Sequence, residues 1–201
     1  MCVPHCARRH TQRYPIHRVR SHLARRSPRR ISVSSRTSAA AVAVMLLERT
    51  GLDPELLLIK RARRENDPWS GQMALPGGRK DDVDLDLFDT VQRETFEETS
   101  VNLSGEQLLG ELDDLHPHAP GLPPMIVRPF VFGLNTRPPI MLNSESTLFL
   151  WAPLGVLADS AGVSRVVVGD RAIVTPSYRA GAHVVWGMTQ RIINPIIELW
   201  K

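Results

Sequence analysis

Residues 76–98 read PGGRKDDVDLDLFDTVQRETFEE, and this stretch determines what we expect of the rest of the chain. We predict a helix from Asp82 to about Ser100, because acidic residues crowd its first turn, where the helix dipole favours negative charge. Side chains for a buried face recur at helical spacing, at Leu85, Phe88, Val91 and Thr95. On this helix Glu94, Glu97 and Glu98 stand at i, i+3 and i+4, so their carboxylates share one face.

Two interpretations of this glutamate face are open. A surface helix tolerates three neighbouring carboxylates when water solvates them. The preceding Pro76-Gly77-Gly78, however, demands a tight loop, and hard divalent cations bind to a few carboxylates together with water and substrate phosphates. Arg93 can pair with a neighbouring carboxylate and orient it. The context therefore favours a cation site.

Short apolar, β-branched runs bounded by turn residues predict strands on both sides of this helix. They cover 39–47 and 55–60 before it, and 125–132, 147–151, 165–168, 171–174 and 182–185 after it. A last apolar helix is predicted over about 186–200, bent or broken at Pro195. This order predicts an α/β domain whose sheet packs between helices.

Charge divides the chain of 201 residues into two parts. The first 38 residues hold ten Arg and both cysteines, but no Lys, Asp or Glu. The rest carries 15 basic and 21 acidic residues. We expect residues 1–38 to be a mostly disordered basic arm, because they can bury too little apolar surface. Residues 39–201 are long enough for one domain with its own core.

The arm has three open interpretations. Its Arg- and Ser-rich, acid-free composition is typical of a mitochondrial transit peptide. It could bind nucleic acid weakly through phosphates, or be a dispensable extension. We predict that deleting residues 1–20 leaves folding and turnover unchanged. We expect a cytoplasmic protein, or a mitochondrial one if the arm is a transit peptide. No apolar run reaches the roughly 18 residues that span a membrane.

The loop and helix resemble the Nudix box, G-x5-E-x7-R-E-U-x-E-E-x-G-U, in which U is a bulky apolar residue. In this resemblance the box positions are taken by Gly78, Asp84, Arg93-Glu94, Thr95, Glu97-Glu98, Ser100 and Val101. The departures are Asp84 for the first Glu, one extra residue before Arg93, Thr95 at an apolar position and Ser100 for the last Gly. The resemblance implies a Nudix-type mixed β-sheet sandwiched between helices.

The longer spacing is similar to that of the coenzyme A pyrophosphatase-like branch of the family. Residues 69–74 (WSGQMA), 122–131 (LPPMIVRPFV) and 183–189 (HVVWGMT) also resemble this branch. So does Leu58-Ile59-Lys60-Arg61-Ala62, although Asn66-Asp67-Pro68-Trp69 stands where the branch has a second arginine. The resemblance covers nearly all of residues 39–201.

The resemblance implies hydrolysis of a diphosphate bond in a nucleoside diphosphate conjugate. It gives Glu94, Glu97 and Glu98 as ligands of Mg²⁺ or Mn²⁺, Glu97 or Glu98 as the base, and Arg93 as an orienting residue. Gly77 and Gly78 bring the backbone close to the site. Asp84 is either a further site acid or a solvated or N-terminal helix acid, and Glu145 is either a further site acid or a plain loop acid. Arg61 and Arg64 contact phosphates or form an exposed basic turn.

Coenzyme A or a derivative is the leading substrate. The alternatives are ADP-ribose, NADH or a nucleoside triphosphate, and a module that binds nucleotides without turnover. The expected partner is therefore a small nucleotide conjugate, without a membrane, and a homodimer is a further expectation.

Overall fold

The computed structural model describes residues 16–32, 37–65, 69–117, 124–168 and 171–200. Its central strand is β1 (Ser38–Leu47), which is buried along most of its length. Alternate residues of β1 enter two separate cores: Val42, Val44 and Leu46 face one, and Ala43 and Met45 face the other. This two-sided burial explains why the strand is apolar throughout instead of alternating with polar residues.

The main sheet is mixed, as predicted. β1 pairs in parallel with β6 (Met125–Leu134), which pairs antiparallel with β5 (Leu108–Glu111). On the other side of β1 lies β2 (Glu55–Arg61), whose outer neighbour is β7 (Ser146–Pro153). A second, antiparallel sheet has the order β10-β9-β8 and comprises β8 (Gly162–Val168), β9 (Arg171–Ala180) and β10 (His183–Trp186).

The way β1 pairs with β2 leaves space between them for residues 76–78, which we call the glycine loop. The two strands pair only near their connecting turn, at Leu46↔Leu56 and Leu47↔Glu55. Beyond that point β3 (Met73–Ala74) pairs with β2, while β4 (Gly77–Arg79) pairs with β1. The loop between β3 and β4 is therefore inserted into the main sheet, and the Ala43 N–H donates to the Pro76 carbonyl at 2.8 Å.

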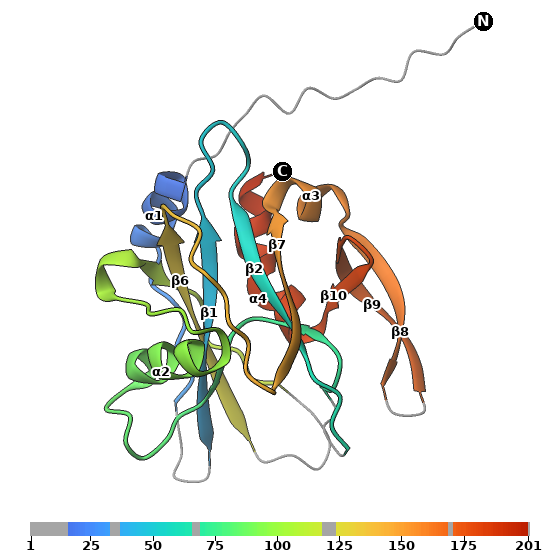
Figure 1. Cartoon of the computed structure of the whole chain (residues 1–201), viewed down its shortest axis with the longest axis horizontal. Helices are drawn as coiled ribbons and strands as arrows, with labels where there is room; N and C mark the ends of the chain where they lie inside the picture. Colours follow the sequence, from blue (N-terminus) through green and yellow to red (C-terminus); the bar gives the residue numbers. More distant parts are fainter. Residues whose placement is uncertain (1–15, 33–36, 66–68, 118–123, 169–170, 201) are drawn as a thin grey trace, which may run out of the picture.

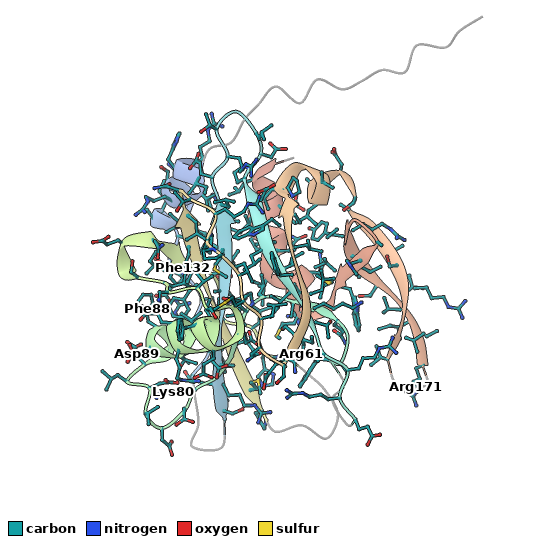
Figure 2. The ribbon with its side chains drawn as sticks, in the orientation of Figure 1. Arg61, Lys80, Phe88, Asp89, Phe132 and Arg171 are labelled. Atoms are coloured by element: carbon teal, nitrogen blue, oxygen red, sulfur yellow. The ribbon has the colours of Figure 1, made fainter. Side chains whose placement is uncertain are left out.

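Helices cover both faces of this sheet (Figure 1). Helix α2 (Leu87–Thr99) packs on one face through Val91 and Phe88, and Phe88 stacks on Phe132 with ring centroids 6.1 Å apart (Figure 2). Helices α3 (Leu154–Asp159) and α4 (Gly187–Ile197) contribute to the other core. Two short 3₁₀ helices, η1 (Gly105–Gln107) and η2 (Glu198–Trp200), complete the elements of the described residues.

The expected disorder of the arm is wrong for its residues 16–32. Ile16, Val19 and Leu23 lie on one face of helix α1 (Ile16–Ala24) and are buried in the core that α4 shares. The helix docks where the sheet carries glycines: a Cβ on Gly110 would lie 2.9 Å from Leu23 Cβ, and one on Gly133 would lie 3.0 Å from Ile16 Cγ2. The apolar surface that α1 buries beside Gly110 and Gly133 offsets the loss of conformational entropy on ordering, which the composition of the arm does not reveal.

Acidic residues at the end of β5 and just after it hold the chain that follows α1. Arg26 pairs with Asp113 at 2.8 Å, Arg30 pairs with Glu111, and the Ile31 N–H donates to Asp114 Oδ2 at 3.0 Å. Part of the arm is thus built into the domain. The expectations for residues 1–15 and 33–36 fall outside the described residues.

One predicted helix boundary and one predicted helix break also need correction. Helix α2 begins at Leu87, not Asp82, because the Asp86 carboxylate accepts from the N–H groups of Phe88 and Asp89 and caps the helix there. Helix α4 continues through Pro195 to Ile197, since Ile192, Ile193, Ile196 and Ile197 anchor its last turns in the core. In the part of the chain that the structure describes, no helix has the length and apolarity to span a membrane.

Candidate active site

The glycine loop brings backbone within reach of α2 at two positions. Gly77 has φ of +142°, and a Cβ there would lie 2.2 Å from the Ala41 carbonyl oxygen. A Cβ on Gly78 would lie 2.2 Å from Glu94 Oε2. The Gly77 N–H donates to Glu98 Oε2 at 2.9 Å. Only glycine fits at position 77, whereas a side chain at position 78 would displace the Glu94 carboxylate, so the loop and the carboxylate face are matched to each other.

The three predicted glutamates lie on the face of α2 that meets this loop. Glu98 is buried, with 4% of its surface exposed. The Glu94 side chain is 19% exposed and that of Glu97 is 53% exposed. Exposure therefore increases along this face, from the buried Glu98 carboxylate beside Gly77 to the Glu97 carboxylate, which reaches water.

Arg93 ties this face to Asp84. Its Nε and Nη2 donate to the two carboxylate oxygens of Asp84 at 2.9 and 2.8 Å, and its Nη1 donates to Glu94 Oε1 at 2.9 Å. Thr90 Oγ1 and the Asp81 N–H also donate to Asp84, both at 2.9 Å. The bidentate bond from Arg93 is the main reason that the pKa of Asp84 lies well below its ordinary value.

The carboxylates at the loop have the opposite electrostatics. Burial raises the pKa of Glu98 to about 7, and the charges of Glu94 and Glu145 push it in the same direction, against the Gly77 hydrogen bond and Arg61. Burial also raises the pKa of Glu94, although Arg93 opposes the shift. Among the described residues, neighbouring positive side chains therefore do not fully balance the charges of Glu94 and Glu98, and this arrangement favours a bound cation.

These groups line one cavity of about 680 Å³. The sequence-predicted residues in its wall are Gly77, Gly78, Glu94, Glu97, Glu98, Arg61, Arg64 and Glu145. At its rim Arg64 Nη2 lies 3.2 Å from Glu145 Oε1, and Arg61, labelled in Figure 2, lies at the end of β2. Asp84 and Arg93 are not part of the lining, because they lie behind Glu94 and hold the helix face in place.

The donor set fits a hard divalent cation. In the described ranges, no three acidic or imidazole side chains form a complete metal cluster by themselves. Mg²⁺ ordinarily keeps several waters and takes one or two carboxylates together with substrate phosphates. Buried carboxylates with raised pKa values, next to open cavity space, match that mode of binding.

The departures from the box have structural explanations. Thr95 is fully buried, so it fills a packing position. Ser100 has φ of 61° and its N–H donates to the Phe96 carbonyl, which ends α2 in the left-handed conformation that glycine adopts most easily. Asp84 is buried and lies before the helix, so the solvated-acid interpretation is wrong.

The sequence reasoning missed the apolar part of the cavity wall. It contains Met73 next to the loop, Met125 and Val127 of β6, and Met188, Thr189 and Ile192 of α4. Segments 122–131 and 183–189 stood out only by resemblance. Their apolar residues read as ordinary core, and no local pattern shows that two distant segments meet across a cavity.

Comparisons with known proteins extend these observations. The family model described as NUDIX domain matches residues 37–154. The human protein named mitochondrial coenzyme A diphosphatase NUDT8 is 30% identical over 171 residues, which cover 82% of this chain and 70% of that protein. Schizosaccharomyces pombe uncharacterized protein C14C4.10c is 34% identical over 131 residues, which cover 62% of this chain and only 40% of the yeast protein.

A solved structure supports the fold. The MutT/nudix family protein from Enterococcus faecalis superimposes with a TM-score of 0.54 over 93% of this chain and 73% of that one. Its sequence is 17% identical, so the likeness concerns the fold alone.

Proposed function

Since the chain belongs to the NUDIX domain family and is a Nudix hydrolase, we propose that it cleaves the diphosphate bond of a nucleotide conjugate with Mg²⁺ or Mn²⁺. Coenzyme A or a derivative is the leading substrate. The observation that carries the proposal is the Glu94–Glu97–Glu98 face against the Gly77–Gly78 loop in one cavity. The relation to the human coenzyme A diphosphatase supports the choice of substrate.

Glu94, Glu97 and Glu98 would hold the cation. When bound, it neutralises phosphate oxygens and lowers the pKa of an attacking water. Arg93 does not touch the cavity; its bonds to Asp84 and Glu94 fix the direction in which the glutamates point. Glu97 and Glu98 are the two candidate bases that would accept a proton from the attacking water.

Arg61 and Arg64 would bind the substrate's phosphate oxygens at the rim. Both line the cavity. Arg64 is paired with Glu145 at a half-exposed site, where an exchange of partners costs little. A phosphate could therefore take the place of the Glu145 carboxylate.

One assay tests the activity. The purified protein is incubated with coenzyme A, acyl-coenzyme A, ADP-ribose, NADH and nucleoside triphosphates, with Mg²⁺, Mn²⁺ or EDTA, and products are separated by chromatography. We expect metal-dependent cleavage, lost in Glu97→Gln and Glu98→Gln and kept in the exposed control Glu106→Gln. If no compound is cleaved with either metal, the chain is a binding module and the enzymatic proposal fails.

A homodimer stays a proposal, and the β8–β9 hairpin is the surface that suits it. Val163 and Val167 are each 69% exposed and Val174 is 70% exposed, and the strand register places them on one face. Figure 1 shows the hairpin extending from the main sheet. Light scattering should give the mass of two chains, and of one chain for Val174→Asp. A single-chain mass for the unmodified protein would rule the dimer out.

The compartment and any weak binding of nucleic acid by the arm also stay proposals. The human relative is named a mitochondrial protein, which supports the mitochondrial alternative over the cytoplasmic one. Imaging of the chain fused at its C-terminus to a fluorescent protein distinguishes the two.

A further inference from the structure

The cavity is built from two parts of the chain with different chemistry. One side is the carboxylate face of α2 with the glycine loop. The other includes α4, which lies beyond the residues that match the NUDIX model. Thr189 is buried and its hydroxyl donates to the Met73 carbonyl at 3.0 Å, which fastens α4 to the strand that leads into the loop. The part of the cavity wall that α4 supplies is thus held in a fixed place.

That wall is apolar. Met73, Met125 and Met188 contribute thioether side chains to it, and Val127 and Ile192 contribute branched ones. Met73, Val127 and Ile192 are buried, whereas Met125 and Met188 are only partly covered and border the open space. The hydroxyl that α4 brings, on Thr189, is already donated to Met73. Methionine is unbranched and polarizable, so such a wall adapts to flexible aliphatic groups.

We propose that Met125 and Met188 determine the specificity of the hydrolase, by accepting an uncharged aliphatic group on one side of the diphosphate. This inference rests on the proposed function and adds to it the two residues that select the substrate, by contact with the aliphatic chain joined to the nucleoside diphosphate. A conjugate with a second sugar would bring hydroxyls against this wall, and buried hydroxyls without partners weaken binding. Discrimination on the order of tenfold or more is what an apolar pocket supplies.

Equilibrium binding separates this inference from the activity. Titration calorimetry in EDTA, where metal-dependent turnover is absent, measures the dissociation constants of coenzyme A and ADP-ribose. We expect the unmodified protein to bind coenzyme A at least about tenfold more tightly. Met188→Gln and Met125→Gln, which keep side-chain length, should each reduce that ratio severalfold, while Met188→Leu and the exposed control Met141→Gln leave it unchanged.

The outcomes are distinct. If the unmodified protein binds both compounds equally, binds neither, or keeps its ratio in both Gln variants, the inference is overturned even if turnover with Mg²⁺ is normal. If the ratio of dissociation constants changes as expected in the variants but no compound is cleaved with metal, the proposed activity fails and the role of Met125 and Met188 in binding is upheld. Melting temperatures within about 3 °C of the unmodified protein show that the variants fold.

Discussion

Replacing Glu98 with glutamine is expected to stabilise the metal-free protein at alkaline pH. The pKa of this buried carboxyl rises from 4.5 to about 7 on folding. A raised folded pKa means that the stabilising contribution is complete below 4.5 and is lost as the pH rises through about 7. At 1.36 kcal/mol per pKa unit, the charged form costs about 3 kcal/mol at pH 8. Glutamine is uncharged, and its carbonyl can still accept from the Gly77 N–H.

Urea unfolding in EDTA at pH 5, 6.5 and 8 measures this difference. We expect the unfolding free energy of Glu98→Gln to exceed that of the unmodified protein by up to about 3 kcal/mol at pH 8, and by little at pH 5. Glu106→Gln, on an exposed turn, should show no difference at any pH. An equal or lower stability of Glu98→Gln at pH 8, or a gain that is the same at all three pH values, would refute the reasoning.

Added Mg²⁺ should narrow the difference in stability between the two proteins. A cation that binds the folded state stabilises it by mass action, and the unmodified protein keeps the carboxylate that this binding uses. We therefore expect saturating Mg²⁺ to reduce the advantage of Glu98→Gln at pH 8. An unchanged advantage would show that the buried charge of Glu98 does not serve a cation.

Three further changes test the supporting structure. Arg93→Lys should lower kcat about 10- to 100-fold, because lysine cannot form the bidentate bond to Asp84. Asp84→Asn should lower kcat by as much, and the double variant should lower it little more than either single variant. Additive losses of kcat in steady-state kinetics would contradict the network. Gly78→Ala should lower kcat by about 100-fold or more, because the added Cβ would meet Glu94; near-normal turnover would contradict the fit. Val19→Asp should lower the melting temperature by about 10 °C, since Val19 is fully buried, whereas Arg20→Asp on the exposed face should shift it by less than about 2 °C; equal shifts in thermal denaturation would mean that α1 is not docked.

Local sequence patterns were sufficient for the elements that define the site. The strand over residues 39–47 and the helix with Glu94, Glu97 and Glu98 are where they were predicted. The start of the helix was missed because the acidic run before it looks helical in composition. In the structure, Asp84 and Asp86 instead bind backbone N–H groups and Arg93, and this competition with helical hydrogen bonding is what short acidic side chains do.

Helix α1 was missed although Ile16, Val19 and Leu23 stand at helical spacing, because the pattern is too short to predict a stable helix by itself. Its nine residues include three buried apolar side chains, Ile16, Val19 and Leu23, among basic and polar neighbours, and an isolated helix of this length is unstable in water. What stabilises it is a notch formed by Gly110 and Gly133, about ninety or more residues later in the chain. The methionine wall was missed for the same reason, since Met125 and Met188 meet only after the chain has folded.

The opposite charges of arm and domain are partly matched inside the fold. Arg26, Arg29 and Arg30 all pair with acids at the end of β5 or just after it. Burial tends to raise the pKa of Asp114, but hydrogen bonds from Arg128 and the Ile31 N–H outweigh it and leave that pKa below its ordinary value. A carboxylate whose pKa falls on folding stabilises the fold above its ordinary pKa and loses that effect as the pH drops. Residues 26–31 of the arm are therefore bound to the end of β5 and the residues after it. The side chains of α1 are part of the core, so cleavage of a transit peptide would leave the core covered only if it cut ahead of α1.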